Sequence, residues 1–230
     1  MNTKLQTIPE GLFDNNTKVT NFESIFWETG ITAIPEGLFD KCTEVTSFSG
    51  AFAKTGITSI PSNLFDKCTK VTTFNQTFRE CSSLQTIPTG LFDYNTKVTD
   101  LSGAFEETSI TSIPEGLFDK CTEVTSFAAA FYNCKSLQTI PVGLFDKNTK
   151  VTNFGGYSSS DYFSGIFSGC CNISGESPYT VINVDGQDVK VHLYERANYP
   201  DYFTAPAHIY NCYNNCYKLT DYSSIPTDWT

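Results

Sequence analysis

The chain has 230 residues, of which 40% are apolar and 14% aromatic, so it is long and apolar enough to bury a substantial core. Its net charge of −10 at pH 7 argues against nucleic acid or an anionic membrane as a partner, since both require a basic face on the protein. No apolar run approaches the roughly 18 residues of a helical span, so we expect no insertion of this region into a membrane.

A fixed phrase, Ile-Pro followed by Leu-Phe-Asp, recurs six times from the N-terminus onward. It begins at Ile8, Ile34, Ile60, Ile87, Ile113 and Ile140, with spacings of 26, 26, 27, 26 and 27 residues. A constant period of this length predicts a repeat solenoid, in which each repeat is one coil stacked on its neighbours. We assign the solenoid to residues 1–154, with about six coils.

Each coil divides into two similar halves of about thirteen residues. Each half starts with an apolar-x-x-apolar stretch that suits a short parallel β-strand, and a 3-10 or helical bend follows it. Apolar residues recur at fixed places in these halves, so we assign them to a core shared between neighbouring coils. Two of these rows are Val19, Val45, Val71, Val98, Val124 and Val151, and Phe22, Phe48, Phe74, Leu101, Phe127 and Phe154.

Cysteine keeps the same register as the core rows. The site three residues after the Leu-Phe pair holds Asn16, Cys42, Cys68, Asn95, Cys121 and Asn148, and the matching site of the other half holds Thr29, Thr55, Cys81, Thr108 and Cys134. A disulfide network would not exchange its members for Asn or Thr. We interpret both sites as buried slots for a small side chain that can form hydrogen bonds.

An aspartate follows every Leu-Phe pair, and two hypotheses account for this row. It is made of Asp14, Asp40, Asp66, Asp93, Asp119 and Asp146. Stacked carboxylates repel one another. In the first hypothesis, bound calcium ions offset this repulsion and the row is a calcium site. In the second, which we favour, each carboxylate accepts backbone N–H bonds at the bend and a neighbouring lysine offsets its charge.

Ligand contacts are expected where the coils differ. The position after the second-half Phe reads Trp27, Ala53, Arg79, Glu106 and Tyr132, and the position after the aspartate row includes Tyr94. Aromatic residues and arginine anchor protein interfaces, so Trp27, Arg79, Tyr94 and Tyr132 are our candidate ligand-binding residues. The alternative is that these are scattered surface residues without a role.

The repeat pattern breaks after Phe154, and we assign residues 155–230 to a modified last coil and C-terminal cap. A polar loop is expected over residues 155–162. Asp185-Gly186 lies between two alternating β-branched stretches, residues 179–184 and 187–193, which predicts an inserted β-hairpin. The phrase aromatic-x-x-Cys-x-x-Leu returns at Tyr213–Leu219 and continues the solenoid.

Catalytic constellations are scarce, so we expect no enzyme activity, no metal and no other cofactor. The two histidines, His192 and His208, lie in no hydrolase, metalloprotease or nucleotide-binding motif. We expect His192 to be partly exposed on its strand. A zinc site built from His208 and the four C-terminal cysteines is disfavoured, because the adjacent and C-x-x-x-C spacings fit structural zinc poorly.

Two of the nine cysteines, Cys171 and Cys212, stand outside the register of the buried slots. If the protein is exported, an oxidising compartment permits a disulfide between them. We predict a Cys171–Cys212 bridge that ties together the two ends of the hairpin insertion.

The string from Phe131 to Pro141, Phe-Tyr-Asn-Cys-Lys-Ser-Leu-Gln-Thr-Ile-Pro, resembles the F-x-x-C-x-x-L-x-x-I-P signature of BspA-type leucine-rich repeats. The resemblance recurs in phase over about two-thirds of the chain, although Phe and Val stand where Leu would dominate. Members are mostly surface or secreted proteins of human-associated bacteria. The resemblance implies a cell-surface or secreted location and adhesion to host or microbial partners, without naming the ligand.

We carry two functional hypotheses forward. The first is a non-enzymatic, monomeric extracellular module that binds a protein or glycan. The second is a structural spacer or stalk with no ligand of its own. Because Lys4 falls inside a coil and no signal peptide follows Met1, we expect the sequence to be a piece of a longer precursor.

Overall fold

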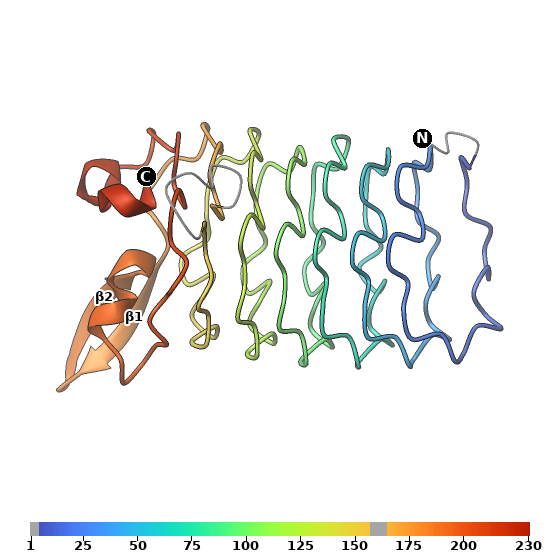
Figure 1. Cartoon of the computed structure of the whole chain (residues 1–230), viewed down its shortest axis with the longest axis horizontal. Coiled ribbons are helices and arrows are strands. Elements are labelled where there is room, and N and C mark those ends of the chain that lie inside the picture. Colours follow the sequence, from blue (N-terminus) through green and yellow to red (C-terminus); the bar gives the residue numbers. More distant parts are fainter. Residues whose placement is uncertain (1–4, 157–164) are drawn as a thin grey trace.

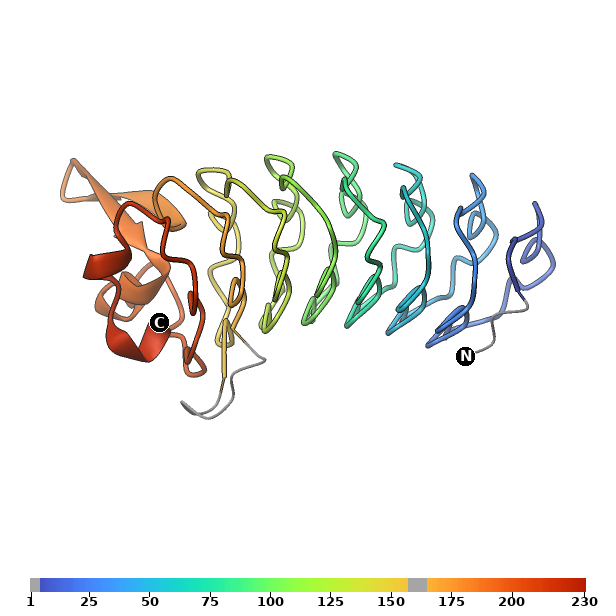
Figure 2. The ribbon, with the colours of Figure 1, turned by 90° about the horizontal axis from the view of Figure 1, so that it is seen from above.

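The computed structural model describes residues 5–156 and 165–230. In it, successive coils stand side by side along the long axis of the molecule (Figures 1 and 2). The N-terminal coil lies at one end, and a β-hairpin with short helices lies at the other (Figure 1). Most of the polar loop expected over residues 155–162 lies outside the described residues.

One side of the stack is joined by a row of single-residue parallel β-bridges, which we call the bridge row. It runs through Asn21, Ser47, Thr73, Asp100, Ser126, Asn153 and His208. The neighbouring threonines reinforce it, because both the N–H and the hydroxyl of Thr46 donate to the carbonyl of Thr20, at 2.8 and 3.1 Å. The short strands that the sequence predicts are therefore reduced to isolated bridges, since each coil turns again within a few residues.

The second half of each coil forms a backbone zipper to the next coil. In the first coil, the N–H groups of Ser24, Phe26 and Glu28 donate to carbonyls of the second coil at 2.8, 2.9 and 3.0 Å. The N–H groups between them close turns within the coil, as Trp27 does onto the Ser24 carbonyl at 3.1 Å. Every backbone donor from Ser24 to Thr29 is thus paired although the segment is neither helix nor strand.

The core lies between the coils, as the repeat pattern predicts. Val71 and Phe74 are fully buried. The Phe74 ring lies 4.7 Å from that of Phe65 and 4.8 Å from that of Phe92, so each ring bridges two coils. Val19 is only partly buried, because the described part of the chain covers its coil on one side alone.

The buried slots satisfy backbone carbonyls across the coil boundary. Asn148 donates through Nδ2 to the carbonyls of Phe118 and Cys121 in the preceding coil, at 3.2 and 2.9 Å. Cys134 donates through Sγ to the carbonyl of Phe105 at 3.1 Å. Burial raises the pKa of the Cys134 thiol to about 12, which keeps it protonated as a donor. The predicted structural role of these cysteines and asparagines therefore agrees with their contacts.

The predicted hairpin is confirmed and begins the cap. Strands β1 (Tyr179–Val184) and β2 (Gln187–His192) pair antiparallel, with Val184 opposite Gln187. Asp185 and Gly186 both have positive φ, 51° and 84°, as the two-residue turn requires. In the part of the cap that the structure describes, three 3-10 helices follow: η1 (Leu193–Asn198), η2 (Tyr222–Ser224) and η3 (Thr227–Trp229).

Arg196 of η1 lies at the C-terminal end of the row of buried slots that includes Cys121 and Asn148. Its guanidinium donates to the carbonyls of Phe145 and Asn148, at 2.8 and 3.0 Å. These correspond to the carbonyls of Phe118 and Cys121 that Asn148 satisfies one coil earlier. Only 1% of Arg196 is exposed, and burial lowers its pKa to about 10. The guanidinium thus takes the place of the asparagine that a further coil would supply.

Gly165 lies directly against the backbone of Asn211 in the last coil. A Cβ there would lie 1.8 Å from the carbonyl oxygen of Asn211, so we expect Gly165→Ala to lower the free energy of unfolding by about 1–3 kcal/mol. Thermal unfolding followed by circular dichroism measures the loss. Gly56→Ala is the matched control, because its Cβ would meet the Ile31 carbonyl oxygen at an ordinary 3.4 Å. Equal losses for the two variants would contradict the close approach.

Candidate functional site

Three of the four candidate contact residues lie in one row along the zipper, which we call the corner row. The row comprises Trp27, Ala53, Arg79, Glu106 and Tyr132. Its register is fixed by the zipper, in which the carbonyls of Arg79, Glu106 and Tyr132 accept from the preceding coil at 2.7, 2.7 and 2.8 Å. Trp27, Arg79 and Tyr132 are each partly exposed. The corner row therefore brings two aromatic residues and an arginine to one edge of the solenoid.

Charged side chains link the corner row into a network. Arg79 contacts Glu106 at 3.1 Å and Glu80 at 2.9 Å, and Lys54 lies 3.7 Å from Glu80. The Lys54 ammonium also lies over the Trp27 ring, 5.7 Å from its centroid. Glu106 is only 7% exposed. Burial raises the pKa of its carboxyl, and the nearby Arg79 charge lowers that pKa by a smaller amount. Arg79 is therefore committed to internal ion pairs, and Trp27 is engaged as well, through its hydrogen bond with Glu28 and the Lys54 ammonium over its ring.

Tyr94 lies apart from the corner row. It follows Asp93 in the aspartate row, and its side chain is 57% exposed. Five of the six carboxylates lie against the glycine three residues earlier, Asp66 having Asn63 in that place, and a Cβ on Gly11 would lie 2.9 Å from an Asp14 oxygen. Among the described residues, no group of three or more His, Cys, Asp or Glu side chains is arranged to hold a metal ion. The geometry supports neither hypothesis for the row: among the described residues no backbone N–H donates to one of these carboxylates, and one Asp146 oxygen is buried without a hydrogen-bond partner.

His192 is buried at the base of the hairpin, contrary to the partly exposed position that its alternating strand predicts. Its Nδ1 lies 3.0 Å from Glu195, and its Nε2 lies 3.1 Å from Glu176 and 3.6 Å from Asp221. The ring also stacks on Tyr194, with centroids 5.0 Å apart. Since Asp221 accepts from the Ser177 N–H at 2.9 Å, the cluster fastens the hairpin to the last coil.

The predicted Cys171–Cys212 disulfide is wrong in this structure, where all nine cysteines are free. Cys171 is exposed, whereas Cys212 is buried and donates to the carbonyl of Ile209 at 2.9 Å. The error came from treating Cys212 as a residue without a core role. Its side chain fills the space against Gly155, where a Cβ would lie 2.8 Å from its sulfur.

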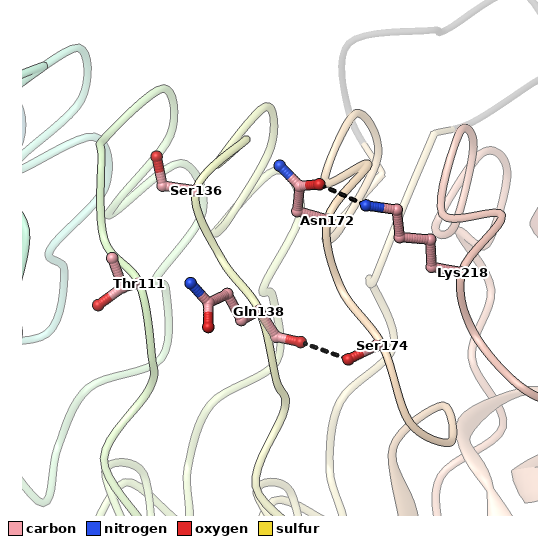
Figure 3. A pocket seen from close by; sticks show the side chains of 6 residues that line it. All are labelled: Thr111, Ser136, Gln138, Asn172, Ser174 and Lys218. Atoms are coloured by element: carbon pink, nitrogen blue, oxygen red, sulfur yellow. Dashed lines mark hydrogen bonds between the residues drawn. The ribbon is translucent and has the colours of Figure 1, made fainter.

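A groove that the sequence analysis missed lies near the cap, on the side formed by the first halves of the coils. It is lined by Thr111, Ser136, Gln138, Asn172, Ser174 and Lys218 and has a volume of about 700 Å³ (Figure 3). We call it the polar groove. The signal for it in the sequence is a second position that varies between coils, the one before the first-half strand, which holds Ser109, Ser136, Asn172 and Lys218 toward the cap.

Residues 1–99 and 52–174 match the BspA type leucine-rich repeat region, in six copies. The chain therefore belongs to the BspA-type leucine-rich repeat family, as the recurring signature predicts. No curated protein matches the chain.

Three solved leucine-rich repeat structures are similar to this chain. One is the ectodomain of the plant receptor kinase GASSHO1/SCHENGEN3 from Arabidopsis thaliana, in complex with CASPARIAN STRIP INTEGRITY FACTOR 2, at 13% identity and a TM-score of 0.51 over 75% of this chain and 18% of that one. The Drosophila Toll–Spatzle complex has 15% identity and a TM-score of 0.46 over 79% and 28% of the two chains. The APL1 leucine-rich repeat domain has 17% identity and a TM-score of 0.44 over 64% and 37%.

The Arabidopsis match supports the leucine-rich repeat fold. The chain spans between 18% and 37% of the length of these three proteins. In the described residues, no helix has the length and apolar character needed to cross a bilayer.

Proposed function

We propose that this chain is a non-enzymatic binding module of a secreted or cell-surface protein, and that it recognises a protein or glycan on a host or microbial partner. The observation that carries the proposal is the corner row, where partly exposed Trp27 and Tyr132 share one edge of a rigid stack with Arg79. Aromatic side chains held by a fixed backbone lose little entropy on contact, which favours their use as anchors. Family membership and the leucine-rich repeat fold add support.

Binding through the corner row predicts that Trp27→Ala combined with Tyr132→Ala lowers affinity for a partner by at least about tenfold, since each anchor contributes about 1 kcal/mol or more. The unfolding midpoint should change little, because both side chains are only partly buried. The immobilised chain is probed with arrays of purified matrix proteins and glycans, and each positive is measured by surface plasmon resonance.

Tyr217→Ala is the matched control, because it removes a 68% exposed aromatic ring that lies outside the candidate contact residues. Arg79 is left unchanged, since its removal would leave buried Glu106 without an ion-pair partner. Partners that bind the double variant as well as the native chain would contradict the role of the corner row. An array with no positives would favour the spacer function instead.

A further inference from the structure

The polar groove has a lining unlike the rest of this acidic chain. Its six side chains carry hydroxyls, amides and one ammonium, and no carboxylate or apolar side chain belongs to the lining (Figure 3). The whole chain, by contrast, has a net charge of −10. The groove therefore presents many hydrogen-bonding groups and one positive charge to whatever enters it.

Part of the lining is held in place and part is left available. Asn172 accepts from the Lys218 ammonium at 2.6 Å and donates to the Lys135 carbonyl at 2.8 Å, which fixes both side chains (Figure 3). Ser174 donates to the Gln138 carbonyl at 3.2 Å. In residues 5–156 and 165–230, by contrast, the side-chain amide of Gln138 and the side-chain hydroxyls of Thr111 and Ser136 form no hydrogen bond. The groove thus combines a fixed ammonium with unused donors and acceptors.

The groove lies where the coils stop repeating. From the second coil onward, the position before the first apolar residue of the first-half strand gains a larger side chain toward the cap, whereas the first coil holds Lys4 there. From the second coil to the last, the position reads Gly30, Gly56, Ser83, Ser109, Ser136, Asn172 and Lys218. The two glycines leave this position without a side chain in the second and third coils. Asn172 and Lys218 are both exposed, and their hydrogen bonds join them to each other and to the Lys135 carbonyl, so they extend this face into the last coils without entering the core.

We propose that the polar groove binds an oligosaccharide that carries a carboxylate, with Lys218 pairing with the carboxylate and Gln138 with ring hydroxyls. A hydroxyl-rich ligand matches the donors and acceptors of the lining, and a charged pair with Lys218 selects an acidic sugar. A protein partner fits less well, because protein interfaces centre on apolar and aromatic anchors that this lining lacks. The inference rests on the proposed binding function, but its site is separate from the corner row.

The test is titration of the whole chain, followed by NMR, with three acidic oligosaccharides: sialyllactose, a hyaluronan hexasaccharide and tri-galacturonate. Lactose is the neutral counterpart of the first. We expect Lys218→Gln to weaken binding of the acidic sugar about tenfold or more and to leave lactose unaffected, because one charge-assisted pair is lost. Gln138→Ala should weaken both. Lys67→Gln, an exposed lysine beside the aspartate row, is the matched control.

Failure of all three acidic oligosaccharides to bind at millimolar concentration would overturn the inference, and so would binding that is indifferent to Lys218→Gln. These results leave the proposed function intact if array partners still depend on Trp27 and Tyr132. Partners that depend on neither site would overturn the role of both surfaces. Folding of each variant is checked by its unfolding midpoint, which should match the native chain because the substituted side chains are exposed.

Discussion

Replacing Phe74 by alanine is expected to lower the free energy of unfolding by about 3–5 kcal/mol, because it leaves a ring-sized cavity between coils. Phe74 is fully buried and lies among the rings of Phe48, Phe65 and Phe92 at 5.9, 4.7 and 4.8 Å. Urea unfolding measured by circular dichroism gives the change. An unaltered urea midpoint would contradict the packing of this row.

The fourth coil supplies the control for this experiment. It holds Leu101 where the other coils hold Phe, and Leu101 is fully buried as well. Phe74→Leu should therefore cost less than the alanine variant, about 1.5 kcal/mol or below if the neighbouring rings repack. If leucine and alanine were equally destabilising, the loss would come from a specific ring contact rather than from the cavity.

Removing the guanidinium of Arg196 is expected to have an effect of similar size. Arg196→Ala leaves the carbonyls of Phe145 and Asn148 buried without a donor, at about 1–3 kcal/mol each, so we expect a loss of about 4 kcal/mol. Hydrogen exchange should report the loss first in the last coils, because solenoid repeats are stabilised by their neighbours. Unchanged protection of these coils would contradict a capping role.

Arg196→Lys tests the fork geometry behind this prediction. A lysine ammonium keeps the charge but does not reproduce the planar pair of donors that reaches both carbonyls. We expect it to recover part of the loss only. Full recovery would mean that charge, and not the two parallel hydrogen bonds, stabilises the end of the row of buried slots.

The repeat register could be predicted from the sequence because burial depends on it in every coil. The buried valine and phenylalanine rows and the hairpin turn at Asp185-Gly186 all follow from periodicity or from turn chemistry. The zipper could not be predicted this way. It places Glu28, Lys54 and Glu80 at φ values of 54°, 59° and 56°, a backbone region that sequence rules reserve for Gly and Asn.

The cap was less predictable than the coils because its contacts join residues far apart in the chain. Arg196 lies 48 residues beyond Asn148, and nothing in the local sequence of η1 marks it as the next member of the row of buried slots. His192 was misjudged for a related reason, since Asp221, which faces its ring, comes from the last coil. Trp27, Arg79 and Tyr132 share an edge because they occupy the same position of the repeat. The polar groove is formed instead by the two positions that flank the first apolar residue of the first-half strand.

The distribution of the nine thiols makes the protein convenient to label. All nine lie in the described part of the chain, and Cys171 is the one that is exposed. Burial raises the pKa of Cys68 and Cys121 to about 12, so these thiols react slowly with maleimides while the fold is intact. Cys171 immediately precedes Asn172 of the polar groove. A fluorophore attached to Cys171 of the native chain would therefore report on the groove without any prior removal of cysteines.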